Sequence, residues 1–236
     1  LKINSSLDYQ GLFGQCGGTE IKNVIVTGCD ISSTGSYIGA IAGYLNNGVI
    51  ENCYATGSVT GSRGAGGLLG GGETVVLKDS GANCEVLGTY HYDAWIGGLA
   101  GAVWNSSGST IERCGISGTV FGYENVGGLI GWAAAVSVND CYSTSAVTGN
   151  TSWSNTGGLI GCANANVSVA NSYAAGLVTN PAAGSYRTGG VIGGDDSTNP
   201  SCTNSYYNGQ NSPGSRGTPL RSEEHTSELQ SHHDLV

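Results

Sequence analysis

The residues that could carry acid–base chemistry in this 236-residue chain are few and far apart. Asp195 and Asp196 form an adjacent pair of carboxylates after a glycine-flanked apolar segment. Paired carboxylates hydrolyse polysaccharides when basic or histidine side chains also hold the sugar. The sequence offers one such histidine, His91, without an accompanying basic motif. We therefore predict that the two aspartates mark a polar turn, that no residue is catalytic and that the chain is not an enzyme.

Metal-ligating residues are equally sparse. His91 lies in a Tyr-His-Tyr-Asp segment that we interpret as a surface loop, and the other histidines are His225, His232 and His233. Those three lie in residues 221–236, a charged, glycine-free stretch that resembles the translation of a sequencing adapter. We exclude this stretch from the fold and expect it to be disordered. Because no CxxC pair or Cys/His cluster occurs, we expect no metal and no other cofactor.

The positions of the eight cysteines are explained better by the repeat described below than by their spacing from one another. Four share one position of that repeat, where serine and valine also occur: Cys53, Cys84, Cys114 and Cys141. We expect these four to be reduced and buried as small hydrophobic side chains, because thiols pack well in cores. Cys202 falls at an apolar position, and the redox state of three others stays open: Cys16, Cys29 and Cys162.

Aromatic side chains give the best indication of a binding surface. They lie in segments of variable length before each glycine pair, and our candidate ligand-binding residues are Tyr90, Tyr92, Trp95, Tyr123, Trp153 and Tyr186. Exposed rings beside Asn, Ser and Thr suit a sugar or a partner surface, whereas rings that only cover the core edge would bind nothing. A second outward set we interpret as a structural tyrosine ladder: Tyr54, Tyr142, Tyr173 and Tyr206.

The elements that position these residues belong to a sequence repeat. A glycine-bracketed apolar motif occurs seven times, and its closing glycines are Gly14, Gly43, Gly70, Gly101, Gly131, Gly161 and Gly193. The spacings of these glycines are 29, 27, 31, 30, 30 and 32 residues. A period near 30 residues with short apolar segments predicts stacked strands, because one unit cannot bury its own apolar face.

A second motif follows each copy, most clearly as Ile-Glu-Asn-Cys-Tyr-Ala-Thr-Gly at residues 50–57. Its first residue is apolar in most copies, its third is mainly asparagine and its fourth is small. We place the third copy at Gly81, so that Asn83 and Cys84 occupy the asparagine and cysteine positions. We expect the asparagines to form a corner of the fold, where their amides hydrogen-bond along the stack.

The repeats predict an all-β fold, a parallel β-solenoid of about seven coils. At about 4.8 Å per coil, it would be roughly 30–35 Å long. Two apolar positions are adjacent in the first motif, for example Leu68 and Leu69. Because alternation in one strand cannot turn both inward, the faces of that strand stay unassigned. We expect the bracketing glycines to bend the backbone through positive φ.

Composition excludes several classes of function. The net charge of −9, from 8 Lys and Arg against 17 Asp and Glu, disfavours nucleic acid as a partner. No apolar stretch is long enough for membrane insertion. The predicted organisation is the end of a preceding segment at 1–8, the solenoid at 9–206 and an exit loop at 207–220. Because the chain starts at Leu1 and contains no methionine, we interpret it as a piece of a longer protein with adjoining domains.

The repeat resembles the GLUG repeat of bacterial surface proteins. The resemblance rests on Gly-Gly-Leu-Ile-Gly at 127–131 and 157–161, on residues 50–57, and on opening and closing copies at 9–24 and 204–220. It covers roughly residues 9–220 and is specific for the repeat. GLUG repeats occur in adhesin-like proteins and in non-catalytic parts of IgA-cleaving metallopeptidases, and they carry no agreed catalytic residues.

The resemblance implies an extracellular or cell-surface location and a non-catalytic stalk that adheres to a host glycan or surface protein. One alternative is an accessory region of a large secreted metallopeptidase whose catalytic domain lies elsewhere. Another is a polysaccharide-cleaving β-helix, which would lose its activity in Asp195→Asn.

Overall fold

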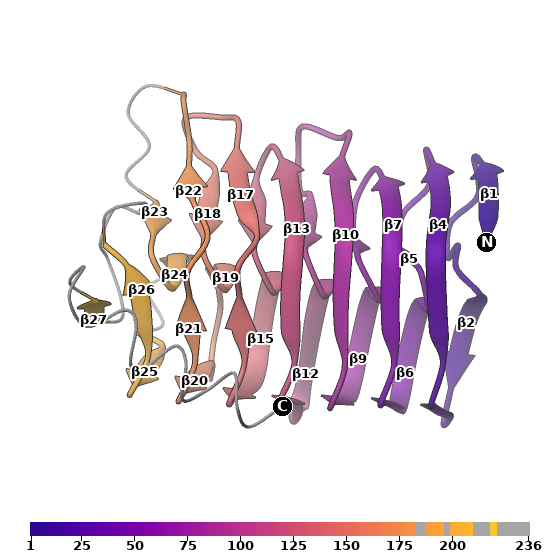
Figure 1. The fold of residues 1–236 in the computed structure, drawn as a ribbon, viewed down its shortest axis with the longest axis horizontal. Helices are drawn as coiled ribbons and strands as arrows, with labels where there is room; N and C mark the ends of the chain where they lie inside the picture. The colour runs from indigo at the N-terminus through magenta and orange to yellow at the C-terminus, as the bar shows by residue number, and fades with distance from the viewer. Residues whose placement is uncertain (183–186, 196–198, 210–217, 221–236) are drawn as a thin grey trace.

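Short runs of β-branched and small apolar residues between glycines form strands, and these strands stack into three parallel sheets (Figure 1). The computed structural model describes residues 1–182, 187–195, 199–209 and 218–220. Within them there is no helix, and so none that could cross a membrane. The predicted all-β class is confirmed.

The three sheets of the described residues run the length of the molecule. Sheet A contains β1 (Lys2–Ser5), β4 (Ile25–Ser33), β7 (Tyr54–Gly61), β10 (Gly81–Gly88), β13 (Gly115–Gly122), β16 (Tyr142–Ser143), β17 (Ala146–Gly149), β21 (Tyr173–Ala174), β22 (Val178–Thr179), β26 (Tyr206–Asn208) and β27 (Thr218–Leu220). Sheet B contains β5 (Ile38–Gly39), β8 (Ala65–Gly66), β11 (Trp95–Gly97), β14 (Asn125–Gly127), β18 (Asn155–Gly157) and β23 (Thr188–Gly189). Sheet C contains β2 (Phe13–Gly17), β3 (Glu20–Lys22), β6 (Ala42–Glu51), β9 (Leu69–Lys78), β12 (Ala100–Glu112), β15 (Ile130–Asn139), β19 (Ile160–Ala163), β20 (Ser168–Ala170), β24 (Ile192–Asp195) and β25 (Ser201–Thr203).

Each coil passes through sheet B, then sheet C, then sheet A. Figure 1 shows the long strands of sheet A side by side, with sheet C behind them. The first coil enters through a parallel bridge between Gln10 and Ile38, and the seventh ends in β26. The chain is therefore a parallel β-solenoid of about seven coils, as predicted. Sheet A also includes β1, which pairs with β4, and β27, which pairs with β26.

Apolar side chains fill the interior in continuous columns. One column joins Ile21, Ile50, Leu77, Ile111, Val138, Val169 and Cys202 by direct register. Leu77 shows that our alignment of the third repeat is wrong, because Gly81 pairs with Tyr54 instead of Ile50. The register of the third coil is set by Leu77, the apolar side chain that fits the core. The nearby Asn-Cys pair at 83–84 matches the motif by residue type alone.

The two adjacent apolar positions of the first motif both point inward because a corner separates them. In the second coil β5 ends at Gly39 and β6 begins at Ala42, with Ala40 and Ile41 in the bend. The carbonyl of Leu68 in the next coil accepts from both Ile41 N–H and Ala42 N–H, each at 3.0 Å. Both side chains are fully buried, so the corner turns two successive residues into the same core.

The glycines around this corner serve close packing, and our positive-φ explanation is wrong for them. A Cβ on Gly157 would overlap the carbonyl oxygen of Ile160, and one on Gly131 would overlap the backbone of Ile96 in the preceding coil. Neither glycine has a left-handed φ. The backbone itself occupies the space that a side chain would need.

The predicted asparagine corner is confirmed at the junction of sheets C and A. Seven stacked residues have φ between 45° and 58°: Asn23, Asn52, Asp79, Arg113, Asp140, Asn171 and Asn204. Asparagine tolerates this left-handed backbone better than most residues. Asn52 donates to Asn23 Oδ1 at 2.6 Å, and Asn204 donates to Asn171 Oδ1 at 3.3 Å.

Two of the three departures from asparagine at this corner, Asp79 and Arg113, compensate each other. Arg113 donates to both carboxylate oxygens of Asp79, in the adjacent coil, at 2.6 and 2.9 Å. This bond holds the pKa of Asp79 below its usual range.

The residue after each corner belongs to a column of small side chains. Ser80, not Cys84, occupies this position in the third coil, so the cysteine column is Cys53, Cys114 and Cys141. The structure describes all eight cysteines, and none forms a disulfide.

Candidate functional site

The candidate site lies where the outer faces of sheets B and C meet. Two columns of side chains face each other there. The side chains of the first column come from the residue just before a short strand of sheet B, such as Tyr37, or from its first residue, such as Trp95. The other follows the closing glycine at the start of each sheet C strand, as Tyr44 and Trp132 do. Because both positions recur in every coil, they form two rows along the solenoid.

Six half-buried aromatic side chains from these rows and their neighbours make a continuous aromatic strip: Tyr9, Tyr37, Tyr44, Trp95, Trp104 and Trp132. Tyr9 stacks on Tyr37 with centroids 5.5 Å apart and planes 3° apart. Tyr37 lies 6.3 Å from Trp95, which lies 6.1 Å from Trp132. Such spacings are those of favourable ring–ring contacts, so the rings hold one another in place.

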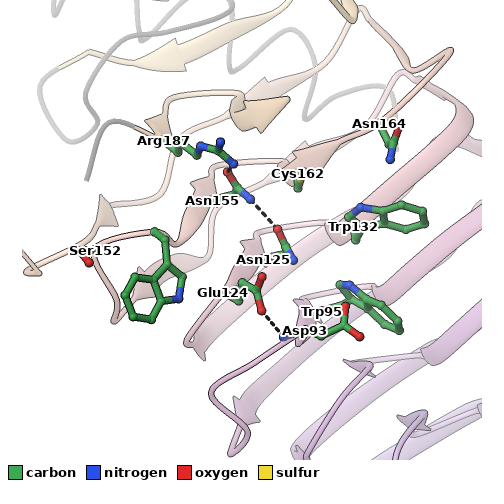
Figure 2. Close-up of a pocket in the computed structure, with 11 residues that line it drawn as sticks. Asp93, Trp95, Glu124, Asn125, Trp132, Ser152, Asn155, Cys162, Asn164 and Arg187 are labelled. Atoms are coloured by element: carbon green, nitrogen blue, oxygen red, sulfur yellow. Dashed lines mark hydrogen bonds between the residues drawn. The ribbon is translucent and has the colours of Figure 1, made fainter. Parts of the chain in front are cut away.

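A polar pocket of about 630 Å³ continues the aromatic strip into the later coils. Trp95 and Trp132 form one end of it (Figure 2), and Trp153 also belongs to its lining. Trp153 is 55% exposed. Rings of this kind around a polar floor offer flat apolar faces and hydrogen-bonding groups to the same ligand.

Amide side chains form the floor of the polar pocket. Asn125 and Asn155 pair in register in sheet B, next to Trp95 in the same row. Asn155 Nδ2 donates to Asn125 Oδ1 at 2.7 Å, and Asn155 Oδ1 accepts from Arg187 Nη1 at 3.4 Å (Figure 2). Cys162 is buried beside them and also lines the pocket.

Charged groups surround Trp95 at this end of the pocket, where Asp93 and Glu124 belong to the lining. Arg63 lies 5.7 Å from the Trp95 ring centroid and forms an ion pair with Asp93. The Asp93 N–H donates to the Glu124 carboxylate. Burial raises the pKa of Glu124. The arrangement fixes one guanidinium over a ring and one carboxylate at the pocket rim.

Only part of the predicted binding set meets at this pocket. Trp95 and Trp153 both line it. Tyr90, Tyr92 and Tyr123 do not line the pocket. Tyr90 and Tyr92 contact each other with ring centroids 6.4 Å apart, and Tyr123 stacks on His91 at 3.9 Å. Tyr186 lies outside the described residues.

The sequence reasoning missed Tyr9, Tyr44, Trp104 and Trp132. Three of these could have been found from the repeat alone. Tyr44 and Trp132 each follow a closing glycine, and Tyr9 stands two residues before the first bracketing glycine, as Tyr37 and Trp95 do. Trp104 could not, because its register neighbours are Glu73 and Ala134.

The carboxylates singled out from the sequence lie elsewhere. Asp195 is half-buried at the end of β24, pairs with Ala163, and does not line the polar pocket. Asp196 lies outside the described residues. Among the residues that the structure describes, no three His, Cys, Asp or Glu side chains are grouped to hold a metal ion.

Comparisons with known proteins agree with this fold. Residues 34–60 match the family model described as the GLUG motif. No curated protein matches the chain significantly. A solved structure titled "Crystal structure of a putative immunoglobulin A1 protease from Bacteroides ovatus" is similar, with a TM-score of 0.70 and 22% identity. The match covers 94% of this chain and 67% of that chain.

The class of protein follows from these observations together: the chain is a parallel β-solenoid built from repeats. More particularly, it carries a GLUG motif in its second coil. At 22% identity the Bacteroides ovatus structure shows the shared fold alone. The motif and the fold fit a non-catalytic repeat region.

Proposed function

We propose that this chain is a glycan-binding stalk module of a bacterial surface or secreted protein, and that the polar pocket is its binding site. The observation that carries the proposal is the grouping of Trp95, Trp132 and Trp153 around the Asn125–Asn155 floor. Sugars stack their apolar faces on rings and present hydroxyls to amides and charged groups. An acidic chain disfavours polyanions, so the glycan is expected to be neutral overall.

The surrounding protein is a separate part of the proposal. The similar structure is titled as an immunoglobulin A1 protease, which supports placing this module beside the catalytic domain of a large secreted peptidase. A row of repeats in an adhesin would use the same coils. In both settings the module extends the chain and binds a host surface glycan or glycoprotein, without catalysis of its own.

The test is a host-glycan array followed by titration of the glycans that bind. Trp153→Ala removes the exposed ring of the polar pocket and is expected to weaken binding about tenfold, which corresponds to about 1.4 kcal/mol. Tyr92→Ala removes a ring that is 64% exposed but lies outside the pocket lining, and it is the matched control.

Unchanged circular dichroism and melting temperature establish that both variants are folded. Binding that persists in Trp153→Ala, or absence of binding by the folded wild-type chain, overturns the proposal. Loss of binding in Tyr92→Ala alone would move the site to the loop at residues 90–93.

A further inference from the structure

The tyrosine column at the start of the sheet A strands is interrupted in the third and fourth coils. The register runs Ile25, Tyr54, Gly81, Gly115, Tyr142, Tyr173 and Tyr206. Tyr142 and Tyr173 stack with centroids 5.5 Å apart and planes 11° apart, as the predicted ladder requires. The two glycines replace two rungs of that ladder.

The missing rings leave a tyrosine groove of about 830 Å³ along sheet A. Its floor includes Gly81 and Gly115, and Tyr54 and Tyr142 stand on either side of them. A Cβ on Gly81 would lie 3.4 Å from the Tyr54 ring, and one on Gly115 would overlap the Tyr142 ring. Each tyrosine therefore leans over a glycine, with its ring facing the groove.

The opposite wall of the tyrosine groove is the left-handed corner. Its lining runs from Asn23 in the first coil to Asn171 in the sixth. Asn52, Asp79 and Asp140 are exposed along this wall, and Arg113 is held by its bond to Asp79. One side of the groove thus offers rings and glycine backbone. The other offers a row of polar groups, one from each coil, which are amides and carboxylates except for the Arg113 guanidinium in the fourth coil.

The repeat distance of this wall selects the ligand. Successive coils are about 4.8 Å apart, which is close to the length of one pyranose unit in an extended β-1,4-linked chain. In an extended peptide, side chains on one face recur about every 6.7 Å. The side chains of a bound peptide would therefore no longer align with the corner residues after two coils. From the first to the sixth coil the row spans about 24 Å, enough for roughly one sugar per coil.

From this geometry we propose that the tyrosine groove binds a neutral, linear β-1,4-linked glycan lengthwise along the solenoid axis. Tyr54 and Tyr142 stack on sugar rings, and the exposed side chains of the corner hydrogen-bond hydroxyls. The groove lies where the strands of sheet A begin, and its lining shares no residue with the polar pocket. It adds a second glycan-binding surface to the proposed function and is tested independently.

The experiment titrates the full chain with cello-, xylo-, manno- and chito-oligosaccharides from disaccharide to hexasaccharide. At least one series is expected to bind with an affinity that rises with chain length up to the hexasaccharide. Tyr54→Ala is expected to weaken that binding about tenfold. Gly115→Tyr restores the missing rung and fills the groove. The three atoms nearest to its Cβ all belong to the movable ring of Tyr142, so this variant should fold and lose binding.

Two controls separate this site from structural effects and from the polar pocket. Tyr206→Ala removes a ring of the same column outside the groove lining and should bind the oligosaccharide like the wild-type chain. The groove variants are also titrated in a Trp153→Ala background, which weakens any binding at the polar pocket, so that the remaining length-dependent binding belongs to the tyrosine groove. The inference fails if no series binds, if affinity is independent of length, or if a folded Gly115→Tyr binds normally. Because the effect of Trp153→Ala is measured separately, a failure of the tyrosine-groove proposal does not overturn the polar-pocket proposal. A failure of the polar-pocket proposal likewise does not overturn the tyrosine-groove proposal.

Discussion

Single small side chains hold the corner of sheets C and A together. Cys141 N–H donates to Ser172 Oγ in the next coil at 3.0 Å, and Cys114 N–H reaches Cys141 Sγ at 3.4 Å. Cys141 Sγ in turn donates to the Asn139 carbonyl at 3.0 Å. Burial raises the pKa of the Cys141 thiol well above its ordinary value, so it stays protonated and remains a donor. The column satisfies backbone groups that the left-handed residue takes out of the sheet ladder.

Cys141→Ala tests this role at the residue scale. The alanine leaves the Cys114 N–H and the Asn139 carbonyl without this buried partner, and we expect a loss of about 1–3 kcal/mol in unfolding free energy. Cys141→Ser should stay within about 1 kcal/mol of the wild type, because Ser172 makes the equivalent bond at 2.7 Å. Urea denaturation followed by tryptophan fluorescence measures both. Equal stability of the two variants would show that the thiol only fills space.

Sequence reasoning reached the asparagines of this corner but not the hydrogen bonds beside them. The asparagines were recognisable because their amides and their tolerance of positive φ suit few other roles. The cysteine column was predicted as apolar, since Cys and Val are exchangeable in cores. The alternation of cysteine with serine was the signal for hydrogen bonding, because serine is buried at little cost only when it is satisfied.

At the scale of the element, the bracketed motif is a device for turning from sheet B to sheet C in two residues. The turn brings Gly157 against the Ile160 carbonyl of its own coil and against Gly193 of the next. Backbone groups of adjacent coils therefore meet with no side chain between them. This is why the motif tolerates exchange among Leu, Ile and Val between the glycines but keeps the glycines themselves in this chain.

Gly157→Ala is the prediction at this scale. The added methyl overlaps backbone atoms that cannot swing aside, so we expect a loss of about 3 kcal/mol or more. Gly17→Ala is the matched control, because its Cβ would meet only the Asn46 carbonyl, at 3.8 Å. It should change stability by less than about 1 kcal/mol. Thermal unfolding by circular dichroism compares the two, and similar melting temperatures would contradict the close-packing explanation.

The repeat also explains how much of the element arrangement was predictable. Period, fold class and the inward columns followed from spacing, because stacking places equivalent residues together. The third copy was misaligned because Asn83 and Cys84 match the motif by residue type, whereas the structure places Leu77 in the apolar column. The aromatic strip was missed in part, because its residues come from two rows that meet only when the corner folds.

At the scale of the whole molecule, the first coil presents an uncovered edge. Leu12 is 45% exposed and Phe13 is 39% exposed, whereas Ile41 and Ala42, their equivalents in the second coil, are fully buried. Strand edges with exposed apolar side chains are sites of pairing between molecules.

We therefore expect this chain to self-associate through its first coil as its concentration rises. Sedimentation velocity over a concentration series measures the change. Replacing Leu12 and Phe13 with lysine should shift the equilibrium towards the monomer, because a charged edge resists pairing. A wild-type chain that stays monomeric throughout the series would show that the edge is closed to pairing in solution.

The nearly constant length of the coils has a mechanical consequence. Backbone hydrogen bonds between coils run along the long axis (Figure 1). Tension applied at the two ends therefore loads the hydrogen bonds of one terminal coil at a time. Each coil that peels away releases about 30 residues, or roughly 100 Å of extended chain. A tether built in this way lengthens in equal steps under load and limits the force that reaches whatever its surfaces hold.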